Sequence, residues 1–279
     1  MRKTLLFTTS LALALAATAA CSTHSVRRSA LVPHMAPTTR DGQGLGDAVG
    51  QLELGSSAIV ALGEPREGDT SAGLHIPTTQ VNGALRLQPR RNFDIGIIYE
   101  RGFDQGSKSI APDQPDPEGD ASGLGVSLGY SVETRDPGFR VGLTMEFINY
   151  TVPYVEYRTC IDNCYGSPYT EVDRAKVGVP VIALGVTPSM RRGPWTFFGG
   201  LTLRSHPTVE RGGIEYGDYN DRDLESGPLN AVVAAGTTFT TPARVSASVL
   251  IYQTISQDPV AYAPTLAATL SLPFGTRQY

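Results

Sequence analysis

Residues 123–132 read G-L-G-V-S-L-G-Y-S-V, and this stretch decides the fold. Its bulky residues alternate strictly with glycine and serine; they are Leu124, Val126, Leu128, Tyr130 and Val132. Successive side chains of a β-strand point to opposite faces, so one face is bulky and apolar and the other is small and polar. A soluble sandwich strand would usually carry Lys, Glu or Arg on its solvent face. A glycine and serine face suits a crowded lumen, with the apolar face turned to lipid, which predicts a transmembrane β-barrel.

The same alternation recurs along the chain and predicts an all-β fold, an antiparallel barrel of about ten strands, with eight or twelve as alternatives. The expected strands lie near residues 51–62, 78–87, 93–100, 123–132, from 139 onward, 173–186, 195–204, 229–239, 244–252 and 261–274. The sixth of them contains Pro180, which cannot donate a ladder hydrogen bond and therefore predicts a bulge or a shorter strand.

The connections between these strands alternate between short and long without exception. The long ones are residues 63–77, 102–121, 150–172, 205–228 and 253–260. Outer-membrane barrels have short periplasmic turns and long extracellular loops, so this alternation supports the barrel. Ten strands would also place both chain termini on the periplasmic side.

Large aromatic residues fall at the expected periplasmic ends of the strands, where an interfacial girdle would lie. They are Phe93, Phe139, Trp195, Phe239 and Phe274.

The composition agrees with a barrel and excludes a helical membrane protein. Beyond the first 20 residues, no apolar run approaches the ~20 residues that a spanning helix needs. The mean hydropathy is −0.12, which alternating strands would produce. The formal net charge is −4, so nothing indicates a nucleic-acid partner.

Residues 1–20 have the pattern of a secretory signal peptide, with Arg2 and Lys3 followed by an apolar run and small residues before Cys21. This resembles a bacterial lipoprotein signal, which implies lipidation of Cys21; Ser22 after it favours delivery to the outer membrane. Thr18 departs from the usual leucine, so ordinary cleavage remains the alternative. We expect residues 21–50 to form a lipidated, flexible tether, because they are rich in Ser, Thr, Pro and Gly without periodicity.

Residues 51–279 resemble small bacterial outer-membrane β-barrel proteins in pattern, without the signature of a named family. The last expected strand resembles the aromatic-terminated strand of such barrels, with either Phe274 or Tyr279 as its terminal aromatic residue. The resemblance implies a location in the outer membrane of a Gram-negative bacterium, in contact with its lipid.

Nine charged residues fall on the expected inner face. They are Glu53, Arg86, Asp94, Glu100, Arg140, Glu146, Lys176, Arg204 and Arg244. A barrel of eight to ten strands is just wide enough for side chains to fill it, and unpaired buried charges are costly. We therefore expect the charges to pair and plug the lumen; a narrow polar pore is the alternative.

The expected loop 150–172 holds two cysteines, Cys160 and Cys164, which predict a disulfide in an exported protein. It is also rich in tyrosine, which offers large contact area at low entropic cost. A binding surface for an extracellular or envelope protein is one interpretation, and a stiffened hairpin is the other. The tyrosines concerned are Tyr150, Tyr154, Tyr165 and Tyr169.

No hydrolase, zinc-protease or phosphate-loop motif occurs, and the acidic run 215–225 lacks the spacing of a calcium loop. The sequence thus predicts no metal, no cofactor and no enzymatic activity. It favours an outer-membrane barrel lipoprotein that acts in surface contact or envelope structure through its outer loops. A narrow channel for small solutes and a soluble, lipocalin-like binding barrel are the alternatives.

Overall fold

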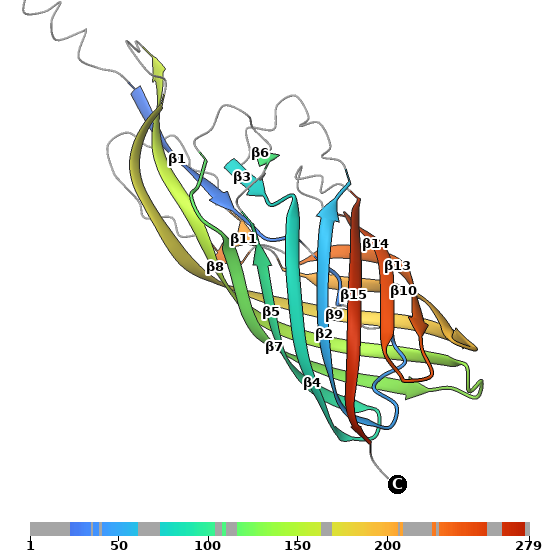
Figure 1. Ribbon diagram of the computed structural model, residues 1–279. Helices are drawn as coiled ribbons and strands as arrows, with labels where there is room; N and C mark the ends of the chain where they lie inside the picture. Colours follow the sequence, from blue (N-terminus) through green and yellow to red (C-terminus); the bar gives the residue numbers. More distant parts are fainter. Residues whose placement is uncertain are drawn as a thin grey trace, which may run out of the picture.

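The computed structural model describes residues 23–34, 36–38, 41–60, 73–103, 108–109, 116–162, 169–205, 207–208, 225–226, 229–255 and 264–276. Ten of its strands form a closed antiparallel barrel, which confirms the predicted fold and strand number (Figure 1). Closure occurs where the last strand pairs with the first barrel strand, from Thr265↔Ile59 to Thr276↔Ala48. Among the described residues, no helix is long and apolar enough to cross a membrane.

The barrel strands follow the chain order around the barrel, each pairing with its neighbours. They are β2 (Ala48–Ile59), β4 (Thr79–Arg90), β5 (Phe93–Gly102), β7 (Ala121–Glu133), β8 (Phe139–Asp162), β9 (Tyr169–Arg192), β10 (Trp195–Arg204), β13 (Asn230–Thr240), β14 (Ser246–Ile255) and β15 (Thr265–Thr276). Two further two-residue strands, β11 (Pro207–Thr208) and β12 (Glu225–Ser226), pair with each other outside the barrel sheet.

The apolar faces of the strands point outward and the small polar faces point inward. In β7, Leu124 is 61% exposed and Val126 48%, whereas Ser127, which follows Val126, is fully buried. The same outward set of leucine, valine, isoleucine and aromatic side chains continues around the other nine strands. This orientation is the reverse of a soluble binding barrel with an apolar interior, so the lipocalin-like alternative is wrong. An exposed apolar band around a closed barrel is the surface that a bilayer covers.

The short turns gather at one end of the barrel together with Thr276, near the C-terminus marked in Figure 1. Aromatic side chains lie at that end, as expected for the periplasmic interface. Trp195 and Phe239 are directly opposed on β10 and β13, with ring centroids 4.9 Å apart. Phe274 at the end of β15 is also exposed there.

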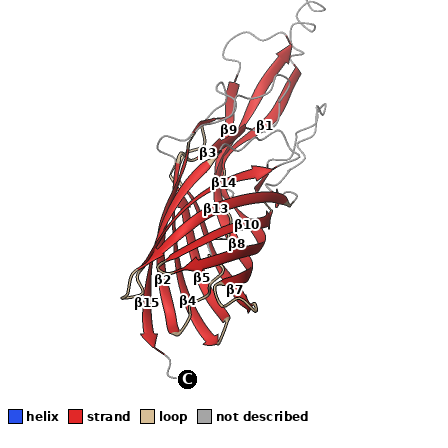
Figure 2. Ribbon diagram, turned by 90° about the vertical axis from the view of Figure 1, so that its right-hand side faces the viewer, coloured by secondary structure: helices blue, strands red, loops and turns tan. Residues whose placement is uncertain are grey.

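At the other end, β8 and β9 continue as a long ribbon beyond the barrel (Figure 2). Each has 24 residues, whereas a strand needs about 9–11 to cross a membrane. Most of the expected loop 150–172 is therefore strand. Pro180 neither bulges nor shortens β9, because the pairing with β10 ends at Ala183 and leaves Pro180 paired with β8 only.

Three short strands extend the ribbon into a sheet at the outer end. They are β1 (Thr23–Leu31), β3 (Gly73–Ile76) and β6 (Lys108–Ser109). β1 lies between β8, to which it is antiparallel, and β3, to which it is parallel. The N-terminal part of the described chain thus lies at the extracellular end.

The chain then reaches the periplasmic end at Ala48, where β2 begins. This differs from two expectations: that both termini are periplasmic, and that residues 21–50 are a free tether. The described part of this segment instead forms β1 and then lies within the barrel. A tether was predicted because residues 21–50 show no periodicity. The hydrogen bonds that order the described part of this segment come from residues distant in the sequence, so no local pattern reveals them.

We predict that an arginine on the outer face destabilises the barrel according to its depth. Val126→Arg, near the middle of β7, should lower the free energy of unfolding by about 2–4 kcal/mol, because it places a cation near the bilayer midplane. Urea titration of the protein refolded into lipid vesicles measures this change.

Val132→Arg at the periplasmic rim of β7 is the matched control and should cost only about 0–1 kcal/mol. Equal effects of the two substitutions would contradict the proposed membrane depth.

Candidate functional site

The barrel interior is the candidate site, and residues 32–34, 36–38 and 41–47 lie within it. The upper part of this segment is held by His34. Its backbone N–H donates to the Gln80 side-chain oxygen at 2.8 Å, and its Nδ1 lies 3.0 Å from Ser57 Oγ. Its Nε2 also contacts the Pro77 carbonyl. His34, Gln80 and Ser57 are all buried, so β2 and β4 fix the segment where it enters the barrel.

The middle of the segment is bonded to β10. Arg204 Nη1 donates to the Ala36 carbonyl at 3.0 Å, and the Thr38 N–H donates to Thr202 Oγ1 at 3.3 Å. Gly185 of β9 leaves space for the segment, because a Cβ at that position would collide with the Thr38 side chain.

The lower part of the segment contacts β8 and β9. Gln43 Nε2 donates to Ser189 Oγ at 2.8 Å, and Arg140 Nη1 donates to the Gln43 carbonyl at 3.1 Å. Gly42 has a φ of +79°, and a Cβ on Gly142 of β8 would lie 2.7 Å from its Cα. Glycine is therefore needed on both sides of this close approach.

A buried charged cluster surrounds the segment in the outer half of the barrel. Arg204 Nη2 lies 3.2 Å from Glu100 Oε2, and Arg204 Nη1 lies 3.9 Å from Glu146 Oε2. The Tyr150 hydroxyl donates to Glu100 and accepts from Arg204, and Gln80 Nε2 donates to Glu100 at 3.1 Å. Two carboxylates thus share one guanidinium, which also bonds the N-terminal segment.

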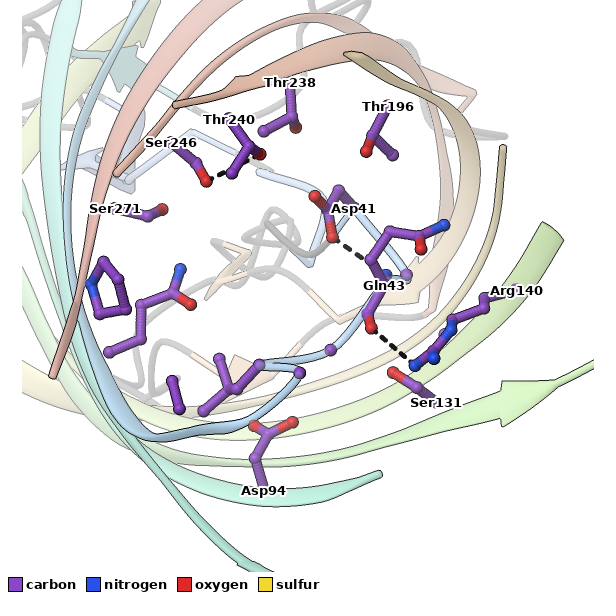
Figure 3. A pocket seen from close by; sticks show the side chains of 18 of the residues that line it. Asp41, Gln43, Asp94, Ser131, Arg140, Thr196, Thr238, Thr240, Ser246 and Ser271 are labelled. Carbon is purple, nitrogen blue, oxygen red and sulfur yellow. Dashed lines mark hydrogen bonds between the residues drawn. The ribbon is translucent and has the colours of Figure 1, made fainter. Parts of the chain in front are cut away.

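The periplasmic half is more open and holds a cavity of about 380 Å³ (Figure 3). One wall carries Arg86 and Glu53, paired at 2.9 Å, beside Asp94. The opposite wall carries hydroxyls from β10, β13, β14 and β15, among them Thr238 and Ser246. Residues near the short turns complete the lining, so this cavity faces the periplasm.

The structure places the nine predicted lumen charges in three settings. Six are buried in the interior: Glu53, Arg86, Asp94, Glu100, Glu146 and Arg204. Arg140 is half-buried at the periplasmic end beside Gln43. Lys176 is exposed on the outer part of β9, and Arg244 is exposed in the turn before β14, where it pairs with Asp47 at 3.6 Å.

The tyrosines and cysteines of the expected loop also lie in different parts of the structure. Tyr150 belongs to the buried cluster, Tyr154 is half-buried on β8, and Tyr169 begins β9. Cys160 lies in the outer part of β8. Tyr165, Cys21 and Cys164 lie outside the described residues, so the lipid and the disulfide stay predictions.

Sequence reasoning missed the interior segment itself, including His34, Thr38 and Gln43. Its one local signal was the run G-Q-G-L-G at 42–46, whose three glycines all have φ between +59° and +79°. Within the described residues, no group of three or more His, Cys, Asp or Glu side chains is arranged to hold a metal ion.

Comparison with known proteins shows the fold alone. No family model matches the chain, and no curated protein matches it. Among solved structures, an outer-membrane channel from Pseudomonas putida F1 is 12% identical with a TM-score of 0.41, covering 86% of this chain and 100% of its own. The translocator domain of the autotransporter NalP from Neisseria meningitidis is 10% identical with a TM-score of 0.40, covering 84% of this chain and 91% of its own.

LpxR from Salmonella typhimurium is a third similar structure, 9% identical with a TM-score of 0.39, covering 80% of this chain and 100% of its own. The protein described here is an outer-membrane-type β-barrel. The prediction that the chain is not an enzyme, which rested on the absence of known catalytic motifs, is wrong, because the similar structure LpxR is an outer-membrane enzyme.

We predict that Arg204→Leu lowers the free energy of unfolding by about 3–5 kcal/mol, because removing one partner leaves buried charges uncompensated. It also removes a bond to the N-terminal segment at Ala36. Urea titration in vesicles, together with the temperature at which the folded gel band is lost, measures the effect.

Arg101→Leu is the control, since its 2.6 Å pair with Asp120 is partly exposed and should matter little. A loss for Arg204→Leu no greater than for this control would contradict the role given to the buried cluster.

Proposed function

We propose that this protein is a non-conducting outer-membrane barrel that acts through its extracellular sheet, in surface contact or in envelope structure. One observation supports this above all others. Residues 32–47 bond to the barrel wall near both ends and in the middle, through His34, Ala36 and Gln43.

The closure follows from the width of the barrel. The interior of a barrel of about eight strands is just filled by its own side chains, and ten strands add limited space. Here a polypeptide segment and the Arg204 cluster share that space. A hydrated ion crossing the outer half would have to displace Arg204, or one of the two groups that Arg204 bonds, the Tyr150 hydroxyl and the Ala36 backbone.

Three ion pairs lie between the outer strands and the chain that leads into β7. Arg174 on β9 pairs with Glu118 at 2.6 Å, and His75 on β3 pairs with Asp116 at 3.1 Å. Arg101 at the outer end of β5 pairs with Asp120. These pairs place residues 116–120, which lead into β7, against three separate strands.

A gated channel is the second candidate, and the periplasmic cavity favours it. That cavity admits solutes to mid-barrel, and release of residues 32–47 would extend the path outward. The two candidates differ in what the resting protein conducts.

We predict that the purified wild-type protein gives no channel steps in a planar bilayer. Deletion of residues 23–45 removes the segment while leaving every barrel strand, and should produce stepwise conductance. The double variant Gly142→Val and Gly185→Val should do the same, because each added side chain occupies the space of the segment.

Gly200→Val is the control, since a Cβ there has its nearest neighbour at 3.4 Å, in the Thr187 side chain, and none in residues 32–47. Conductance by the resting wild-type protein would favour the channel. Silence of the deletion variant would show that the segment is not what closes the lumen.

We further propose that Cys21 is lipidated and that Cys160 and Cys164 form a disulfide at the outer end of the ribbon. The support is the sequence: a signal-peptide pattern before Cys21, and an even pair remaining in an exported chain.

Growth with an alkyne-tagged fatty acid should label the wild-type protein, and Cys21→Ser should abolish the label. Cys160→Ser should retain it, which separates lipidation at the N-terminus from acylation elsewhere. An unlabelled wild-type chain would show ordinary signal-peptide cleavage instead.

A further inference from the structure

The position of β1 has a consequence beyond closure of the lumen. β1 pairs with the part of β8 that lies outside the barrel, from Ala30↔Tyr154 to Thr23↔Asp162. Because the pairing is antiparallel, the chain is farthest from the membrane at Thr23 and approaches the barrel as it proceeds to Leu31. Figure 2 shows β1 beside the protruding ribbon.

The part of β8 that lies beyond the barrel is long. Tyr150 already belongs to the outer interior cluster, and at ~3.3 Å per residue β8 extends roughly 40 Å from Tyr150 to Asp162. The end of β1 at Thr23 therefore lies well outside the apolar band of the barrel.

β1 is held there as an internal strand. It pairs with β8 from Thr23 to Ala30, and its last three residues, Ser29–Leu31, also pair with β3 on the other edge. Ala30, Leu31 and Val32 are completely buried, and Ala30 and Val32 pack in one apolar cluster with Ile76 and Val152. Leaving this site would expose that apolar surface and break two strand ladders.

The next residues cross the barrel and emerge at the other end. After the bonds of His34, Ala36 and Gln43 to the wall, Asp47 pairs with Arg244 in a periplasmic turn. One uninterrupted segment thus has its first residues outside and its last residues in the periplasm.

We infer that the barrel carries its own N-terminal segment across the membrane, so that the chain preceding Thr23 is displayed on the cell surface. Cys21 precedes Thr23 by two positions, so a lipid attached to Cys21 would be presented at the outer face. This is opposite to a lipoprotein anchored in the periplasmic leaflet.

The sequence offers a direct test, because its three lysines are Lys3 in the signal peptide, Lys108 and Lys176. Lys176 is exposed on the outer part of β9 and serves as the internal marker of the surface. Thr23→Lys adds one amine at the end of β1. Arg135→Lys adds one amine in the exposed periplasmic turn between β7 and β8 and is the matched control.

Intact cells producing each variant are treated with a membrane-impermeant amine reagent, and the labelled positions are read by mass spectrometry. We expect position 23 and Lys176 to be labelled in intact cells, and position 135 to be labelled only after permeabilisation. Labelling at position 23 should increase less than twofold on permeabilisation.

Absence of label at position 23 in intact cells whose Lys176 is labelled would overturn the inference. If Thr23→Lys prevents assembly, so that Lys176 is also unlabelled, Ser25→Lys in the same strand gives the same two outcomes. Labelling and conductance test different claims. A barrel that conducts no ions and whose position 23 is not labelled in intact cells would refute surface exposure of the N-terminal segment, and it would leave the proposal of a closed lumen unaffected.

Discussion

The structure depends on the requirement that no strand edge be left unpaired in lipid. In the hydrocarbon region, backbone donors and acceptors have no water to bond, so a sheet is stable there only when it closes on itself. Pairing of β15 with β2 supplies that closure. It also creates an interior isolated from lipid, where Arg204 lies 3.2 Å from Glu100 and 3.9 Å from Glu146. The exposed apolar band and the polar interior are two consequences of the same closure.

One guanidinium, that of Arg204, bonds both the barrel wall and the N-terminal segment. Arg204 compensates the buried carboxylates of β5 and β8, and it also donates to the Ala36 carbonyl of the N-terminal segment. Arg204 therefore contributes both to the stability of the barrel wall and to the attachment of the segment. The glycines Gly142 and Gly185 complement this coupling, because they let the segment approach the wall closely. The same N-terminal segment also contributes to the outer sheet, since its first residues form β1 between β8 and β3.

Most of the fold could be predicted because apolar and small polar residues alternate along a membrane strand, and this local alternation shows which face meets lipid. Alternation in residues 123–132 fixed which face of β7 meets lipid, and Trp195 and Phe239 marked the periplasmic rim. The candidate site was predictable only in part. Glu100, Glu146 and Arg204 could be assigned to the interior from alternation, whereas their grouping depends on the relative register of three strands. Tyr150 was expected in a loop, because the alternation that continues through Tyr150, Val152 and Tyr154 does not by itself show that the inner face of β8 stays buried beyond the barrel.

The sequence was enough to predict the barrel: an approximate strand number, the face that meets lipid, and the end that carries the short turns. These follow from side-chain alternation and turn length, which are local properties of the chain. The path of the described residues between 23 and 47 became evident only in the folded chain. That path is set by bonds such as His34 to Gln80, Ala36 to Arg204 and Gln43 to Ser189, whose partners lie 46, 168 and 146 positions away. A segment without hydrophobic periodicity is ordered here by the wall that surrounds it, and that wall exists only once the barrel has closed.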